Sequence, residues 1–146
     1  MDRISRNITP VAPFDFELTA GYLTYFQGRY ATDSLVDGVY RRLLDLDGQL
    51  VLASVSSLGS LEKPELSVEL QGEGLTSDNV EVATDKVAWI LGVGQELEPF
   101  YASAQGDPAM AAITQRFHGL HMPHTASVFE ALVLAVLGQQ IATNVA

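Results

Sequence analysis

Three histidines spaced three residues apart are the first side chains in this 146-residue chain that could do chemistry together. On one face of a helix, His118, His121 and His124 would present three imidazoles to a zinc ion. Gly119 and Pro123 interrupt the segment, however, and both residue types favour a loop over a helix. The sequence has no cysteine, so no thiolate is present to complete such a site. We therefore predict a loop here, with no metal and no cofactor.

Acidic side chains are abundant, but none shows the paired spacing of catalytic carboxylates. We expect the acids of the first half in solvated strand ends and loops: Asp45, Asp47, Glu62, Glu65, Glu69 and Glu73. We likewise interpret Arg41 and Arg42 as part of a charged strand face. The net charge is −10, whereas a protein that binds nucleic acid normally carries an excess of basic residues. By charge alone, this chain is expected to repel DNA.

The elements that must position any site begin with strands. Two apolar-rich runs, 39–46 and 49–55, flank an Asp-Gly pair, which is a strong signal for a two-residue hairpin turn. With that turn, Leu44 is expected opposite Val51, and Leu43 opposite Leu52. A further strand over 65–71 alternates apolar and polar residues, which places Leu66, Val68 and Leu70 inward. Residues 14–16 are predicted to form a short additional strand. Together these runs indicate an antiparallel sheet with one solvated face.

Helical patterns surround and follow the sheet. A first helix is predicted over 19–27, and a second begins after an apparent capping box formed by Asp78 and Glu81. The second helix should bury Val80, Ala83, Val87, Ile90 and Leu91. Later helices are expected over 96–104, from Pro108 towards Phe117 behind an Asp107 cap, and from Ser127 to the end of the chain.

The last predicted helix is apolar on almost every side over its first turns. Its apolar residues are Val128, Phe129, Leu132, Val133, Leu134, Val136, Leu137 and Ile141. A helix of this kind must be enclosed by protein. Because the sequence ends shortly afterwards, we expect a C-terminal half that this chain lacks to supply the enclosing surface.

No feature directs the chain to a membrane or to secretion. The longest apolar stretch, 131–137, is too short to span a bilayer. The charged first residues are not followed by the apolar run of a signal peptide. The absence of cysteine fits a reducing compartment, so we expect a cytoplasmic protein.

Two groups of motifs carry a resemblance to a known family. The more specific group lies in the last helix, where Phe129-Glu130-Ala131-Leu132-Val133 precedes Leu137-Gly138-Gln139-Gln140-Ile141. Ahead of it stand Glu96-Leu97-Glu98-Pro99-Phe100-Tyr101, Asp107-Pro108 and Phe117-His118-Gly119-Leu120. The less specific group is Pro13-Phe14-Asp15-Phe16, followed by Gly21-Tyr22-Leu23. In this order the motifs are similar to those of the helix-hairpin-helix DNA glycosylase superfamily, DNA-3-methyladenine glycosylase II type.

The resemblance implies an α+β fold. Residues 1–94 would form an antiparallel sheet with two packed helices, similar to the TATA-binding protein, and 95–146 the first helices of an all-α glycosylase domain. It also implies a base-excision-repair enzyme that flips an alkylated base, such as 3-methyladenine, out of double-stranded DNA and hydrolyses its N-glycosidic bond. The DNA-gripping hairpin and the catalytic Asp of the family have no counterpart in this sequence. The segment alone is therefore expected to be inactive, with damaged DNA as the partner of the full-length enzyme.

The resemblance assigns roles to few residues of this chain. Tyr22 matches a position where the family places an aromatic side chain of the base pocket. Gln140, after Gly138 and Gln139, matches the position of the side chain that fills the gap in the DNA stack. Without the resemblance, Tyr22 reads as a core aromatic on an amphipathic helix, and the two glutamines read as a solvated helix surface.

Two other classes of function remain open. The chain would be a non-enzymatic scaffold or interaction module if its apolar last helix packed against a partner or a second copy. It would be a small-ligand-binding domain if the helix face around Tyr22 formed a pocket of its own.

Overall fold

The structure is a computed structural model that describes residues 1–25 and 33–140. Strands and helices are mixed in the first part, and helices follow alone, so the fold is α+β as predicted. The elements are β1 (Asp2–Ile8), α1 (Phe16–Leu23), β2 (Asp33–Val36), β3 (Val39–Leu46), β4 (Gln49–Ser57), β5 (Leu66–Gly72), α2 (Ser77–Ile90), α3 (Glu98–Ala104), α4 (Pro108–Arg116) and α5 (Val128–Gln140).

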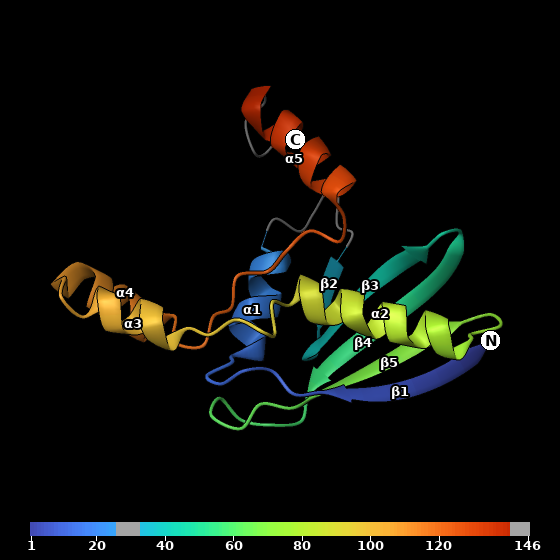
Figure 1. Cartoon of the computed structure of the whole chain (residues 1–146), viewed down its shortest axis with the longest axis horizontal. Coiled ribbons are helices and arrows are strands. Elements are labelled where there is room, and N and C mark those ends of the chain that lie inside the picture. The colour runs from blue at the N-terminus through green and yellow to red at the C-terminus, as the bar shows by residue number, and fades with distance from the viewer. Residues whose placement is uncertain (26–32, 141–146) are drawn as a thin grey trace.

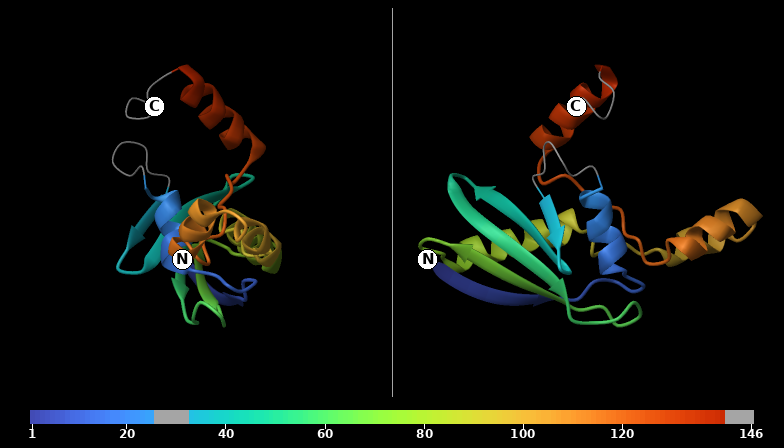
Figure 2. Two further views of the ribbon diagram at one scale, coloured as in Figure 1. Left: turned by 90° about the vertical axis from the view of Figure 1, so that its left-hand side faces the viewer. Right: turned by 180° about the vertical axis from the view of Figure 1, so that it is seen from behind.

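The strands form one sheet in the order β1-β5-β4-β3-β2, and each neighbouring pair is antiparallel. Helix α2 lies across one face of this sheet (Figure 1). When the sheet is viewed from behind, its opposite face is covered by no helix of the described residues (Figure 2). The predicted antiparallel sheet with one solvated face is thus confirmed.

The β3–β4 hairpin has the predicted register. Leu44 lies opposite Val51, and Leu43 opposite Leu52. The turn residues both have a positive φ, 55° at Asp47 and 92° at Gly48. Such a pair of left-handed residues gives a turn whose twist matches that of the flanking strands.

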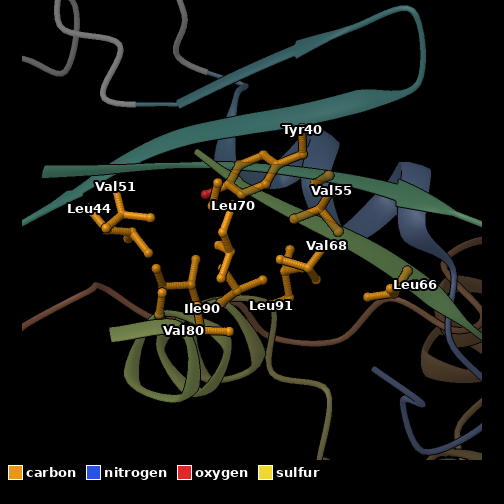
Figure 3. Close-up of a cluster of buried hydrophobic side chains, with 14 of the residues drawn as sticks. Tyr40, Leu44, Val51, Val55, Leu66, Val68, Leu70, Val80, Ile90 and Leu91 are labelled. Carbon is orange, nitrogen blue, oxygen red and sulfur yellow. The ribbon is translucent and has the colours of Figure 1, made fainter. Parts of the chain in front are cut away.

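The core lies between the sheet and α2 (Figure 3). Alternate residues of β3, β4 and β5 point toward the helix, and the predicted inward residues Leu66, Val68 and Leu70 are fully buried. The buried face of α2 consists of Val80, Ala83, Val87 and Ile90, as its spacing predicts. Burying an aliphatic side chain of this size contributes roughly 1.5–3 kcal/mol. The interface therefore supplies much of the stability of the five-stranded sheet with α2, called the sheet unit below.

The predicted strand over 14–16 is wrong. Phe14 and Phe16 are buried, which explains the alternating pattern, but Asp15 between them is the N-cap of α1. Its side chain accepts a hydrogen bond from the Leu18 backbone nitrogen at 2.9 Å. Helix α1 therefore begins three residues earlier than predicted, and it ends at Leu23 instead of continuing through residues 24 and 25, which form a turn. The last two residues of the predicted helix, 26 and 27, lie outside the described residues.

The two outer strands were not predicted. In β1 only Ile4 and Ile8 pack against the core, because its other side chains are polar and exposed. Strand β2 has only four residues. Outer strands of this kind lack the apolar alternation that identifies an inner strand.

The cap of α2 also differs from the prediction. Thr76, rather than Asp78, is the N-cap, and its capping-box partner is Asn79. The Thr76 hydroxyl accepts from the Asn79 backbone nitrogen at 3.2 Å, and the Asn79 side chain accepts in return from the Thr76 backbone nitrogen. By contrast, Asp107 caps α4 and Ser127 caps α5, as predicted.

Two helical parts project from the sheet unit. The α3–α4 hairpin extends beyond one end of it, and α5 leaves in another direction (Figure 1). The apolar residues of α5 are exposed, among them Val128, Phe129, Leu132, Leu134 and Val136. Among the described residues, no helix combines the length and apolar character needed to cross a membrane.

Candidate functional site

An apolar pocket of about 460 Å³ opens beside α1. One wall comes from that helix and the turn after it, and the other comes from the segment that follows α4. The lining residues are Glu17, Leu18, Gly21, Tyr22, Tyr25, Phe117 and Leu120. Aromatic and aliphatic side chains from distant parts of the chain thus form a surface suited to a flat, apolar or aromatic ligand.

Tyr22 lines this pocket and is 56% exposed. The alternative interpretation of Tyr22 as a core aromatic is therefore wrong, because its helix buries Phe16, Thr19 and Ala20 instead. The side chain is available to a ligand. Its assignment to base binding is not tested by its position and stays a prediction.

His121 joins the two walls of the pocket. The residue is fully buried, and its backbone nitrogen donates to the Thr19 hydroxyl of α1 at 3.2 Å. Its ring nitrogens lie 2.6 Å from the Gly92 carbonyl oxygen and 3.0 Å from the Pro13 carbonyl oxygen. The ring also meets Phe14 edge to face at 4.8 Å. These contacts fix the segment after α4 against α1.

Gly119 allows the same segment to approach the start of α1. Its carbonyl oxygen accepts from the Asp15 backbone nitrogen at 2.7 Å. A Cβ at this position would lie 2.8 Å from that nitrogen and 2.5 Å from Leu61 Cδ1. The φ of +84° is also unfavourable for any other residue. Only glycine fits this contact without rearrangement.

The three histidines lie in a loop, as predicted, and their side chains contact different partners. The His124 ring stacks on Trp89 at 4.3 Å between centroids. The His118 ring lies 4.8 Å from that of Tyr101. Within residues 1–25 and 33–140, no group of three histidine, aspartate or glutamate residues is placed to hold a metal ion.

The residues predicted to fill the gap in the DNA stack lie at the end of α5. Gly138 and Gln139 lie exposed in the last turn of α5. Gln140 is the last residue of that helix, and its side chain is outside what the structure describes, as is Ile141. The roles predicted for these residues stay predictions.

A buried ionic cluster lies under the start of α5. Arg42 is only 7% exposed, so its interpretation as part of a charged surface is wrong, whereas Arg41 is exposed as predicted. Nη1 of Arg42 donates to both carboxylate oxygens of Asp33 at 3.1 Å. Nη2 donates to Oε2 of Glu130 at 2.7 Å. The Tyr40 hydroxyl also donates to Asp33.

Charge and burial act together on this cluster. Burial lowers the pKa of Arg42, but the hydrogen bond to Glu130 and the charges of Asp33 and Glu130 outweigh it and raise that pKa above its ordinary value. Burial, followed by the charge of Asp33, also raises the pKa of Tyr40. The arginine is thus held positive and the tyrosine neutral at any ordinary pH.

The sequence contained a signal for the buried arginine. In the alternation of β3, Arg42 falls in register with the inward residues Tyr40 and Leu44, while Arg41 and Leu43 point outward. Reading the two arginines as one charged pair concealed this difference. The partner Glu130 lies 88 residues away, so no local pattern could have identified it.

Comparison with known proteins gives a likeness in structure. Neither a family model nor a curated protein matches the sequence. Among solved structures, the chain is similar to a 3-methyladenine DNA glycosylase from Archaeoglobus fulgidus, with a TM-score of 0.71 and 24% identity. The likeness covers 94% of this chain but only 45% of that enzyme. The chain therefore shares its fold with a little under half of a 3-methyladenine DNA glycosylase.

Proposed function

We propose that this chain supplies the sheet domain, over 1–94, and the opening helices, over 95–146, of a base-excision-repair DNA glycosylase. In the complete enzyme, an alkylated base of the 3-methyladenine type is flipped out of damaged double-stranded DNA, and its N-glycosidic bond is hydrolysed. The observation that carries the proposal is the joint presence of this fold and an apolar pocket with Tyr22 in its wall.

The chemistry of the pocket supports a base as ligand. A base has a flat π-face, and stacking on an aromatic side chain stabilises it by roughly 1–3 kcal/mol. Tyr22 and Tyr25 of α1 and Phe117 of the opposite wall provide such side chains. In this proposal Tyr22 stacks on the flipped base, and Gln140, preceded by Gly138 and Gln139, enters the gap that the base leaves in the duplex.

The segment alone is proposed to be inactive. Its described residues offer no carboxylate next to the aromatic pocket except the exposed Glu17. Its net charge of −10 opposes binding to DNA phosphates. The proposal therefore assigns the catalytic Asp and the basic DNA-binding surface to sequence outside these 146 residues.

The proposal is tested by base release from alkylated duplex DNA. The 146-residue chain is compared with the protein encoded up to the next in-frame stop codon. Release by the longer protein alone is the expected result. If the 146-residue chain releases the base by itself, the catalyst lies within it, and the assignment made above is wrong.

The exposed apolar surface of α5 favours one other function. Five of its apolar side chains are more than half exposed, which is more apolar surface than a monomer normally leaves in water. A scaffold that associates with itself through α5 would bury this surface. Light scattering on the purified chain separates the two proposals, because a stable dimer without base release by either form supports the scaffold.

A further inference from the structure

We infer that Arg42 is a positioning residue that fixes the start of α5 on the sheet, and so sets the direction in which α5 leaves it. The inference rests on the proposed function only in its consequence: α5 carries Gly138, Gln139 and Gln140, so the same contact would aim these residues at DNA. The contact itself is a property of this chain, whatever the function of the chain proves to be.

The geometry shows a bridge between two distant elements. Arg42 lies on β3, inside the sheet unit, and Glu130 lies in the first turn of α5. One carboxylate oxygen of Glu130 accepts both from Arg42 Nη2 at 2.7 Å and from the Ala126 backbone nitrogen at 3.1 Å. The Glu130 backbone nitrogen in turn donates to the Ser127 hydroxyl at 3.1 Å. A single carboxylate thus ties the cap of α5 to the sheet.

The guanidinium of Arg42 donates hydrogen bonds to both acids. Nη1 faces Asp33 and Nη2 faces Glu130, while Nε is buried without a hydrogen-bond partner. A buried donor left unpaired opposes folding, so this orientation is maintained by the two carboxylates. Lysine could not replace arginine here, because a single ammonium cannot present a planar fork to two acids.

Among residues 1–25 and 33–140, few other contacts hold α5 in place. Its apolar side chains beyond the first turn are exposed, and the nearest packing is that of Ala126, which rests on the core just before the helix. Among the contacts that the described residues make, the ionic one is therefore the chief determinant of the direction of α5. Because Asp33 still neutralises Arg42 when Glu130 is lost, removing Glu130 should free α5 without disturbing the sheet.

Paired spin labels test the inference directly. The chain has no cysteine and one tryptophan, so Ser54→Cys on β4 and Ala135→Cys on α5 can be labelled selectively, and Trp89 on α2 reports unfolding of the sheet unit. In this background the distance between the two labels should give a single narrow peak. Glu130→Ala, which removes the acceptor for both donors, should abolish that peak and leave the denaturation midpoint from Trp89 fluorescence unchanged.

Two arginine variants complete the experiment. Arg42→Gln should abolish the narrow peak and also lower the denaturation midpoint, because Asp33 and Glu130 then face each other without a cation. Arg41→Gln, at the exposed neighbouring position, is the matched control and should change neither the distance distribution nor the denaturation midpoint. A narrow peak retained in Glu130→Ala overturns the inference, as does a broad distribution in the unmutated labelled chain. Neither outcome depends on base release, so the proposed function would stand or fall separately.

Discussion

The sheet unit and α5 differ in how far their apolar side chains are shielded from water. Both are rich in aliphatic side chains, yet Leu70 of β5 is fully buried and Leu134 of α5 is more than half exposed. The sheet packs against α2, while among the described residues α5 is tied to the sheet by an ionic contact at its start. Similar apolar content therefore gives a stable core in one region and an uncovered surface in the other. The partners of a segment, rather than its composition alone, determine its stability.

The largest expected effect comes from truncating matched leucines in the two regions. Leu70→Ala should lower the free energy of unfolding by about 2–5 kcal/mol, because it opens a cavity in a packed core. Leu134→Ala should change it by less than about 0.5 kcal/mol, as for other exposed positions. Urea denaturation followed by Trp89 fluorescence measures both. Equal losses would mean that α5 is packed as tightly as the sheet.

A second prediction concerns the junction between the two regions. His121→Ala should lower the free energy of unfolding by about 1–3 kcal/mol, because the buried carbonyl oxygens of Pro13 and Gly92 lose the ring that faces them. His118→Ala is the control, since that side chain is 41% exposed, and it should have little effect. Circular dichroism during thermal unfolding provides the comparison. An equal loss of stability in the two variants would show that His121 does not join the two walls of the pocket.

The smallest of these effects should come from the hairpin turn. Gly48→Ala should destabilise the sheet unit by about 1 kcal/mol, because alanine is strained at a φ of 92°. Gly106→Ala, in open space between α3 and α4, is the control. It should leave the unfolding midpoint almost unchanged. An unchanged unfolding midpoint in Gly48→Ala would indicate that residue 48 does not have a positive φ in the turn.

Strong local signals explain what could be predicted from the sequence. The Asp-Gly turn determined the hairpin register, and the spacing of Val80, Ala83 and Val87 identified the buried face of α2. Strand β1 escaped prediction because an outer strand needs few apolar residues. The contact between Arg42 and Glu130 escaped because it joins residues 88 positions apart. For the same reason, Tyr22 could be proposed for a pocket, but its opposite wall at Phe117 and Leu120 could not.

The most direct test of the account is the part played by Tyr22 in base release. In the longer protein to which the proposal assigns base release, Tyr22→Ala should lower kcat/KM for an alkylated base about tenfold or more, because stacking on the flipped base is lost. Leu43→Ala, equally exposed at 56% but on the bare face of the sheet, should leave kcat/KM unchanged. If Tyr22→Ala is as active as Leu43→Ala, the pocket beside α1 does not receive the base.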